Sequence, residues 1–325
     1  MQIGMVGLGR MGANMTLRLT QQGHEVVAFD VNPEAVAGVA SEGAKGVADI
    51  DELVQALEPP RAVWLMLPAG PITEDTVLHL EETLTSGDTI VDGGNSNYQH
   101  AIADAERLAQ KGITFVDAGV SGGVWGLKEG YCLMVGGDAS ACQRLEPIFL
   151  ALAPENGYAH VGPVGAGHYA KMIHNGIEYG MLQAYAEGFA LLHAADEFDF
   201  NLREVAELWR HGSVVRSWLL DLAVLALENE AEFSKIKGYV EDSGEGRWTV
   251  DEAVKRAVPA PVLTMALFER FSSRRTDNFA ARIIAALRNE FGGHKLFEES
   301  AGADAARQQA GASEKSAGPE AAATQ

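Results

Sequence analysis

A glycine-rich segment near the N-terminus, GLGRMG at residues 7–12, constrains the fold of this chain more than any other part of its sequence. It directly follows an apolar run, Gln2–Val6, and opens an amphipathic stretch, Met11–Gln22, so it predicts a strand, a tight turn and a helix. In such a unit the first glycine permits the turn, the second lets a pyrophosphate approach the backbone, and the third lets helix and strand pack closely. The N-terminus of the helix faces the phosphates. The segment therefore predicts a dinucleotide-binding unit.

The first half of the chain alternates short apolar runs with amphipathic stretches, which is typical of crossover units around a mainly parallel sheet. The predicted strands are Gln2–Val6, Glu25–Phe29, Ala62–Leu67, Thr89–Val91 and Ile113–Val116. The predicted helices are Met11–Gln22, Pro33–Ser41, Ile50–Leu57, Ile72–Leu84 and Tyr98–Gln110. We expect an α/β fold that begins with a Rossmann-type doubly wound sheet over residues 1–164.

The pattern changes at about Gly165, after which strand signals disappear and helical patterns follow. The predicted helices of this part are His168–Ala195, Asn201–Arg210, Ser217–Asn229, Val250–Ala257 and Ala280–Asn289. They predict a separate all-helical domain over residues 165–299. Residues 300–325 contain few large apolar side chains and cannot bury enough surface to offset their chain entropy, so we expect a disordered tail there.

Composition narrows the classes of partner. The formal net charge of −20 argues against a nucleic-acid partner, because a phosphate backbone requires a basic surface. No apolar run is long enough to span a bilayer, and the richest one, Trp218–Leu227, contains Asp221. The N-terminus lacks an export signal, and two cysteines, Cys132 and Cys142, are too few for a disulfide framework. We expect a cytoplasmic protein, and no residue cluster has the spacing of a metal site.

An acidic residue, Asp30, ends the second predicted strand, where the motif expects a partner for the adenosine ribose hydroxyls. A carboxylate accepts hydrogen bonds from a free 2′-hydroxyl but repels a 2′-phosphate, and no arginine follows nearby. We therefore expect NAD rather than NADP; the alternative is a solvated acid at a strand end. The predicted cofactor contacts are Gly7, Leu8, Gly9, Arg10, Met11, Gly12, Asp30, Asn32, Leu67, Pro68, Ala69 and Asn95.

Three polar residues in the segment after the glycine-rich link share one helix face. At about 100° per residue, Lys171, Asn175 and Glu178 fall within roughly 60° of one another. This spacing usually carries apolar core residues, and here it carries a base, an amide and an acid. The segment lies at the predicted domain junction, where clefts occur, and it predicts a catalytic site. The alternative is an exposed face of salt-bridging charges.

Three motifs together resemble the β-hydroxyacid dehydrogenases: GLGRMG, DAGVSGG at residues 117–123 and AKMIHNGIEYG at residues 170–180. Within that superfamily, HNGIEYG and the later SGEGRWT at residues 243–249 resemble the short form of the 6-phosphogluconate dehydrogenase family. The resemblance covers the chain from Met1 to about His294. It implies oxidation and decarboxylation of 6-phosphogluconate to ribulose 5-phosphate, with a nicotinamide cofactor and without a metal.

The resemblance also implies the roles of the catalytic residues. Lys171 matches the lysine that takes the proton from the 3-hydroxyl while hydride leaves C3, Glu178 matches the acid that protonates C1, and Asn175 is expected beside them. A lysine base must be neutral when it acts, against an ordinary pKa of about 10.4. We therefore expect burial and a bound nicotinamide ring to lower the pKa of Lys171.

Substrate contacts follow from the same resemblance. The sugar acid's carboxylate and hydroxyls are expected at Asn95, Ser121, Gly122, Gly123, His174 and Asn175, and its phosphate at Tyr179, Arg270, Arg288 and His294. In the family, the arginine and histidine of the last segment reach into a neighbouring subunit's site. The resemblance thus implies a homodimer or homotetramer with shared active sites. Without it, Asn95 is an ordinary turn residue, Arg288 a surface residue of a helix and His294 a helix C-cap.

One departure weakens the match at the phosphate. Where the family commonly has KGTGKWT, this chain has Ser243 and Glu245 in place of a lysine and a threonine. A glutamate beside a phosphate is unfavourable unless it turns away or pairs with Arg247. A non-decarboxylating dehydrogenase for a small acid such as 3-hydroxyisobutyrate remains an alternative. A nonenzymatic NAD-sensing or scaffold protein is a second one.

Overall fold

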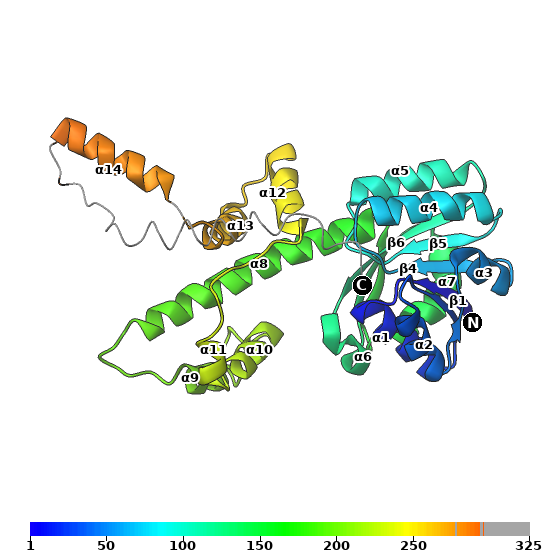
Figure 1. Cartoon of the computed structure of the whole chain (residues 1–325), viewed down its shortest axis with the longest axis horizontal. Coiled ribbons are helices and arrows are strands. Elements are labelled where there is room, and N and C mark those ends of the chain that lie inside the picture. The colour runs from blue at the N-terminus through cyan, green and yellow to red at the C-terminus, as the bar shows by residue number, and fades with distance from the viewer. Residues whose placement is uncertain (277, 293–294, 296–325) are drawn as a thin grey trace. The chain divides into compact units, whose positions relative to one another are not determined.

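The computed structural model describes residues 1–276, 278–292 and 295, and it divides into two compact units, Met1–Ser273 and Arg274–Gln325. The first unit holds the sheet together with the helices up to α13 (Figure 1). In the second unit the described helix is α14 (Phe279–Gly292). The predicted tail at 300–325 lies outside the described residues.

One eight-stranded sheet, in the order β3-β2-β1-β4-β5-β6-β7-β8, forms the N-terminal part. All neighbouring strands are parallel except β6 and β7, which are antiparallel. The strands are β1 (Gln2–Val6), β2 (Glu25–Phe29), β3 (Lys45–Gly46), β4 (Ala62–Leu65), β5 (Thr89–Asp92), β6 (Thr114–Ser121), β7 (Cys132–Gly136) and β8 (Tyr158–Gly162). This topology confirms the predicted doubly wound α/β class.

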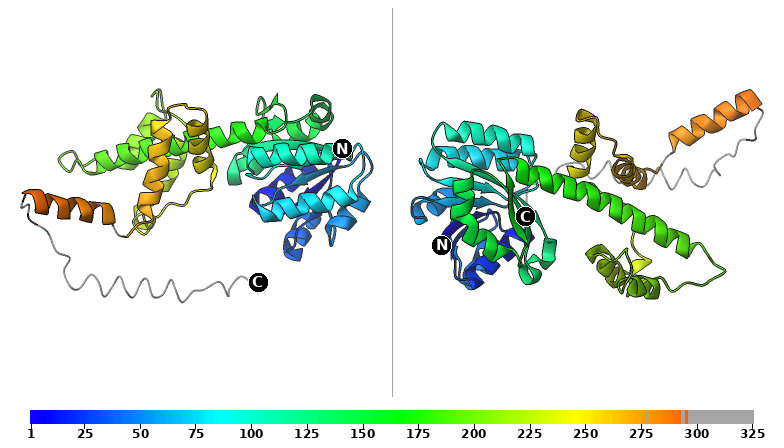
Figure 2. Two further views of the ribbon diagram at one scale, coloured as in Figure 1. Left: turned by 90° about the horizontal axis from the view of Figure 1, so that it is seen from above. Right: turned by 180° about the vertical axis from the view of Figure 1, so that it is seen from behind.

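Helices cover both faces of this sheet because its central strands are apolar on both sides (Figure 2). On one face α1, α2 and α7 contribute Met15, Leu19, Val39 and Phe149 to the core. On the other face α3, α4 and α5 contribute Leu53, Val77, Leu80 and Leu108. The helices of the sheet region are α1 (Arg10–Gln21), α2 (Pro33–Ser41), α3 (Ile50–Ala56), α4 (Pro71–Thr83), α5 (Tyr98–Ala109), the 3₁₀ turn η1 (Gly123–Trp125), α6 (Gly126–Glu129) and α7 (Ala139–Leu152).

A helical region follows the last strand, as predicted. It comprises α8 (Ala166–His193), α9 (Leu202–Trp209), α10 (Trp218–Ala226), α11 (Glu230–Phe233), α12 (Glu245–Lys255) and α13 (Pro261–Ser273). The first half of the 28-residue α8 packs against β6 and β7 on one side and against α12 and α13 on the other. This helix therefore links the sheet to the helical region and carries the residues of the predicted catalytic face.

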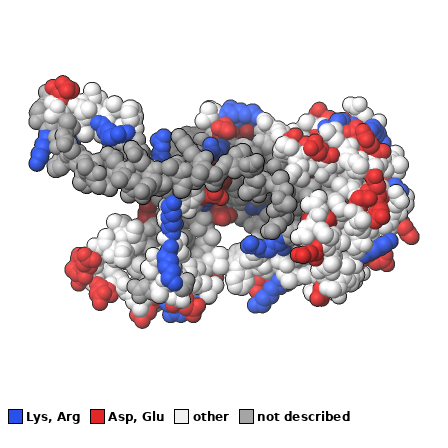
Figure 3. Space-filling view, viewed as in Figure 1, with Lys and Arg blue, Asp and Glu red and all other residues white. Residues whose placement is uncertain are grey.

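Several elements differ from the sequence prediction. The structure adds β7, β8 and α7, and β6 continues to Ser121 rather than ending at Val116, because residues 117–121 pair with β7. α12 begins at Glu245, five residues before its predicted start, and α13 was not predicted. Among the described residues no helix is both long and apolar enough to cross a membrane. Acidic and basic side chains are interspersed on the face drawn in Figure 3.

Candidate active site

The glycine-rich turn has the geometry that a bound dinucleotide requires. Gly7 has φ +93°, in the left-handed region that favours glycine. A Cβ at Gly12 would lie 1.9 Å from the carbonyl oxygen of Gly7, so the helix can pack this closely on the strand only with glycine there. A Cβ at Gly9 would meet no atom within 4 Å. Gly9 is also the N-cap residue of α1, and no side-chain hydrogen bond caps the start of this helix. The turn is thus open where a pyrophosphate would approach, and its residues fit the group.

Hydrogen bonds to the carboxylate of Asp30 connect this turn to the end of β2. Its carboxylate accepts hydrogen bonds from the backbone N–H groups of Leu8, at 2.6 Å, and Asn32, at 2.7 Å. The neighbouring Val31 is 90% exposed. Asn32 uses its own side chain to cap α2, accepting from the N–H of Glu34 at 3.0 Å.

The loops after β4 and β5 meet at the carboxyl edge of the sheet. A Cβ at Gly94 would lie 2.7 Å from the carbonyl oxygen of Leu67, so the two loops touch. Thr73 donates a hydrogen bond to the carbonyl of Pro68 at 2.8 Å and fixes the first loop. Asn95 is exposed directly after this contact, and a small pocket here is lined by Ala69 among others. Ligands of doubly wound sheets bind at this edge.

Helix α8 lies unusually close to β6. A Cβ at Gly119 would lie only 2.5 Å from the Cβ of Lys171, and one at Gly167 only 2.4 Å from the carbonyl oxygen of Asp117. Asp117 caps the start of the helix, since its two carboxylate oxygens accept from the N–H groups of Gly165 and His168, each at 2.7 Å. These contacts place the lysine over the carboxyl-terminal half of β6.

Lys171 is buried and held by its own helix. Its Nζ donates to Oδ1 of Asn175 at 2.5 Å, and each of the two residues is only 7% exposed. Burial lowers the pKa of Lys171, while the charges of Glu245, Glu178 and Cys132 oppose this effect. Glu178 leaves 39% of its side chain exposed. At Lys171 and Asn175, the predicted polar face of the helix is therefore buried rather than exposed to solvent.

His174 joins this group to the end of β6. Its Nδ1 lies 3.0 Å from Oδ1 of Asn175 and 4.0 Å from Oε2 of Glu178. Its Nε2 lies 3.5 Å from Oγ of Ser121. Gly122, with φ +136°, continues the chain from Ser121, and Gly123 begins η1 with φ +53°. The structure thus brings Ser121, His174 and Asn175, three of the residues expected around the sugar acid, together beside the lysine.

A second group lies about two turns further along α8. Tyr179 is buried, and its hydroxyl accepts from the N–H of Ser243 at 3.1 Å. The guanidinium carbon of Arg270 lies 3.4 Å from the centre of the Tyr179 ring. These are two of the residues predicted to bind phosphate. Arg288 is exposed on α14 in the second unit, and His294 lies outside the described residues.

The arrangement around Glu245 answers one question that the sequence left open. Glu245 does not pair with Arg247, whose guanidinium donates to Asp242 at 2.8 and 3.1 Å. Glu245 instead turns inward, is 2% exposed, and accepts a hydrogen bond from Oγ of Ser243 at 2.8 Å.

A buried polar cluster at the start of α8 was missed by the sequence analysis. Nε2 of His168 lies 3.2 Å from Oδ2 of Asp92, whose other oxygen accepts from the N–H of Gly94 at 2.9 Å. Burial alone would raise the pKa of Asp92 and lower that of His168. The hydrogen bond and opposite charges of the pair outweigh it, so the pKa of Asp92 is lowered and that of His168 raised. Burial raises the pKa of Asp117. The available signal was an acid directly after each of two predicted strands, Asp92 and Asp117, and a histidine one turn before Lys171.

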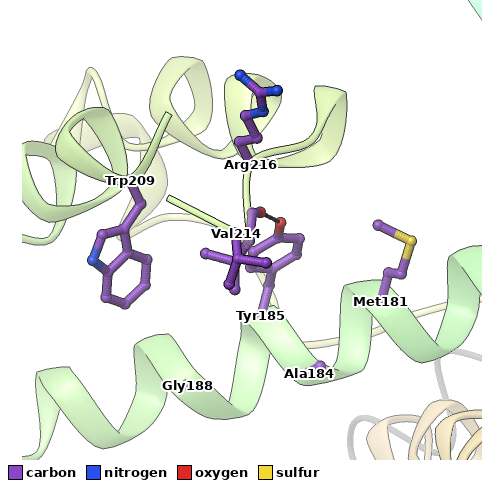
Figure 4. Close-up of a pocket in the computed structure, with 8 residues that line it drawn as sticks. Met181, Ala184, Tyr185, Gly188, Trp209, Val214 and Arg216 are labelled. Carbon is purple, nitrogen blue, oxygen red and sulfur yellow. Dashed lines mark hydrogen bonds between the residues drawn. The ribbon is translucent and has the colours of Figure 1, made fainter. Parts of the chain in front are cut away.

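A larger apolar pocket, of about 580 Å³, lies along the later part of α8 (Figure 4). It is lined by Met181, Ala184, Tyr185, Gly188, Trp209, Val214, Val215 and Arg216. The Tyr185 hydroxyl donates to the carbonyl of Val215 and lies 2.9 Å from Oγ of Ser217. None of the predicted site residues is among the lining residues, so we place the candidate site at Lys171 on chemical grounds rather than in this larger pocket.

The fold and this site define a dehydrogenase that binds a nicotinamide dinucleotide. Residues 2–162 match the model of the NAD-binding domain of 6-phosphogluconate dehydrogenase, and residues 167–285 match that of its C-terminal domain. The chain belongs to the 6-phosphogluconate dehydrogenase family.

Individual relatives agree with the family models. The chain is 44% identical over 294 residues to Bacillus subtilis YqeC, whose name assigns 6-phosphogluconate dehydrogenase only provisionally; 90% of this chain and 98% of YqeC are covered. It is 42% identical over 298 residues to the NAD(+)-dependent, decarboxylating 6-phosphogluconate dehydrogenase of Haloferax volcanii, covering 91% and 98% of the two chains. The Plasmodium falciparum 6-phosphogluconate dehydrogenase, solved with NADP+ and with 6-phosphogluconate, superposes with a TM-score of 0.78 at 26% identity, over 93% of this chain and 67% of that one.

Proposed function

We propose that the protein oxidises and decarboxylates 6-phosphogluconate to ribulose 5-phosphate and carbon dioxide, with NAD as the hydride acceptor. The observation that carries the proposal is a buried lysine, Lys171, on one helix face with Asn175 and Glu178. The name of the Haloferax volcanii relative supports the same reaction.

The lysine is suited to act as a base. Burial lowers the pKa of Lys171, so a larger neutral fraction is present near neutral pH than for a free lysine. Its hydrogen bond to Asn175 fixes the amine, and the Gly119 contact fixes the base of the side chain. Lys171 takes the proton of the substrate's 3-hydroxyl. The amine, now protonated, then stabilises the oxygen of the 3-keto acid while carbon dioxide leaves.

Glu178 is suited to complete the reaction. It is partly exposed, one turn beyond His174 on the same face, so it can reach a substrate that lies over the lysine. It donates the proton that C1 of the enediol requires. A dinucleotide held by its pyrophosphate at the glycine-rich turn would supply, through its nicotinamide ring, the acceptor for the C3 hydride. The residues that would hold this cofactor are those of the Gly7–Gly12 turn, with Asp30 selecting NAD over NADP.

A spectrophotometric assay at 340 nm tests the reaction. We expect NADH formation with 6-phosphogluconate, release of carbon dioxide in equal amount, and little rate with gluconate or 3-hydroxyisobutyrate. Lys171→Ala should abolish turnover, whereas Glu178→Gln should spare hydride transfer more than the final protonation. Oxidation of 3-hydroxyisobutyrate in preference, without carbon dioxide release, would replace this proposal with the non-decarboxylating alternative. Undiminished turnover by Lys171→Ala would refute the assigned base.

We also infer a cytoplasmic homodimer or homotetramer whose sites are shared, with Arg288 and His294 reaching the neighbouring subunit's phosphate. The support is the resemblance of residues 288–294 to the family segment. Light scattering measures the assembly. Mixed subunits test the sharing, since inactive Lys171→Ala and Arg288→Ala proteins should regain activity when they are dissociated and reassembled together. No recovery from mixed oligomers would contradict shared sites.

A further inference from the structure

The first turn of α12 lies against the part of α8 that carries the candidate catalytic residues. The hydroxyl of Thr249 donates to the carbonyl oxygens of both Met172 on α8 and Glu245 on α12, each at 2.9 Å. A Cβ at Gly176 would lie 2.6 Å from a side-chain atom of Thr249, and one at Gly246 would lie 2.5 Å from the ring of Tyr179. The start of α12 is therefore fixed alongside α8 between Met172 and Tyr179, the stretch that also contains Asn175 and Glu178.

Glu245, the first residue of α12, is buried at this contact. Its carboxylate accepts a hydrogen bond from the hydroxyl of Ser243 at 2.8 Å. Burying a carboxylate is costly unless positive charges or several donors compensate for it. The charge of Glu245 acts on two basic groups of α8 one turn apart: it opposes the lowering of the Lys171 pKa by burial, and it helps to raise the pKa of His168. The compensation therefore comes from α8.

The groups that face Lys171 divide clearly between the elements packed around it. From α8 come Glu178 and His174, which lie at the more exposed side, and from β7 comes Cys132. β6 contributes Gly119, which brings no charge. α12 contributes Glu245, which opposes the lowering of the Lys171 pKa more than Glu178 or Cys132 does. Of the two carboxyl groups, only Glu178 is open to a substrate.

We propose that Glu245 is a positioning residue for Lys171: a buried counter-ion, supplied by α12, that balances the positive charge the lysine acquires when it takes the substrate's proton. The proposal rests on the proposed role of Lys171 as base. It gives the departure from the family's KGTGKWT a purpose, because the acid that replaces threonine is buried where α12 packs against α8. Glu245 exchanges no proton; its charge acts on the amine alone.

The test compares the pH dependence of kcat/KM for the full-length protein and two variants with 6-phosphogluconate and NAD. Glu245→Gln removes the charge and keeps an oxygen that can accept from Ser243. Asp251→Asn is the matched control, because Asp251 is an exposed acid on the same helix. Without the counter-ion the protonated amine is less stable, so the acidic limb of the Glu245→Gln profile should move to lower pH. For each protein, kcat/KM at one pH on that limb is divided by its plateau value. This ratio should be about threefold to tenfold higher for Glu245→Gln than for wild type.

Three further measurements distinguish a counter-ion from a residue with only a structural role. Glu245→Asp, which keeps the charge, should leave the limb close to that of wild type. Glu245→Leu should move it as Glu245→Gln does, and this variant serves if the glutamine variant is unstable. The plateau kcat should fall with little change in KM, because the counter-ion acts on the lysine rather than on the substrate.

Superimposable limbs for wild type and both charge-removing variants would overturn the proposal, and so would an equal displacement in Asp251→Asn. These outcomes differ from failure of the proposed function itself. That failure would appear as full activity of Lys171→Ala, or as no turnover of 6-phosphogluconate by the wild-type protein.

Discussion

Replacing Asp30 with asparagine tests how the end of β2 selects the cofactor. The substitution removes one negative charge and keeps one oxygen that can accept a hydrogen bond. Two unit charges about 5 Å apart in water interact by roughly 0.8 kcal/mol, so a 2′-phosphate with about two charges is disfavoured by about 1.7 kcal/mol. Salt screening reduces this value. We therefore expect the ratio of kcat/KM for NADP to that for NAD to rise about fivefold to twentyfold.

The same substitution should also cost stability. The two carboxylate oxygens of Asp30 accept from the N–H groups of Leu8 and Asn32, and an amide has only one oxygen for these two donors. Loss of one such bond costs about 1 kcal/mol, which urea unfolding can measure. Glu34→Gln is the control, because Glu34 is an exposed acid of the same loop and helix start. A cofactor ratio that stays within twofold of wild type, or that rises equally in the control, would refute the electrostatic reasoning.

Three further predictions concern the site and its support. Gly119→Ala places a methyl group 2.5 Å from the Cβ of Lys171, so it should cost about 1–3 kcal/mol in urea unfolding and lower kcat; an unchanged kcat would show that the close contact does not position the lysine. Ser243→Lys should lower KM for 6-phosphogluconate and leave that for gluconate unchanged, and equal effects on both would argue against a phosphate site there. Burial raises the pKa of Asp117 above its ordinary 3.8, so its ionisation opposes folding as the pH rises from the pKa in the unfolded chain through the raised pKa in the folded one. The free energy of unfolding of wild type relative to Asp117→Asn should therefore decrease with rising pH over this range. A difference that increases would contradict the burial argument.

Sequence patterns predicted the strands that are apolar on both faces and the helices between them. β1 and β2 have the predicted bounds, because each is a short apolar run between a turn and a helix. β7 and β8 escaped prediction for a physical reason: β8 has three exposed residues among its five, so it lacks the apolar run of a buried strand. The second half of β6 was not predicted because Gly119 interrupts its apolar run. This glycine lets α8 approach the strand closely.

For the site, spacing on one helix was enough to group Lys171, Asn175 and Glu178, because i, i+4 and i+7 positions share a face whatever surrounds the helix. Spacing could not show which of them are buried. It also could not link Lys171 to Glu245, which lies 74 positions further along the chain and affects the lysine's pKa because α12 packs against α8. The sequence left two arrangements open for this glutamate, turning away from the phosphate or pairing with Arg247, and in the structure Arg247 pairs with Asp242 instead.

The capping of α8 by Asp117 has a consequence for how such an enzyme can diverge. This carboxylate and the Gly119 contact position Lys171, the proposed base, relative to the sheet, within six residues of the start of the helix. The groups expected at the far end of the substrate come from other elements or from later in α8: Tyr179 from α8, Arg270 from α13 and Arg288 from α14. Under the proposed function, substitutions on α13 can therefore change which acid is accepted, while the contacts that position Lys171 against β6 stay unchanged.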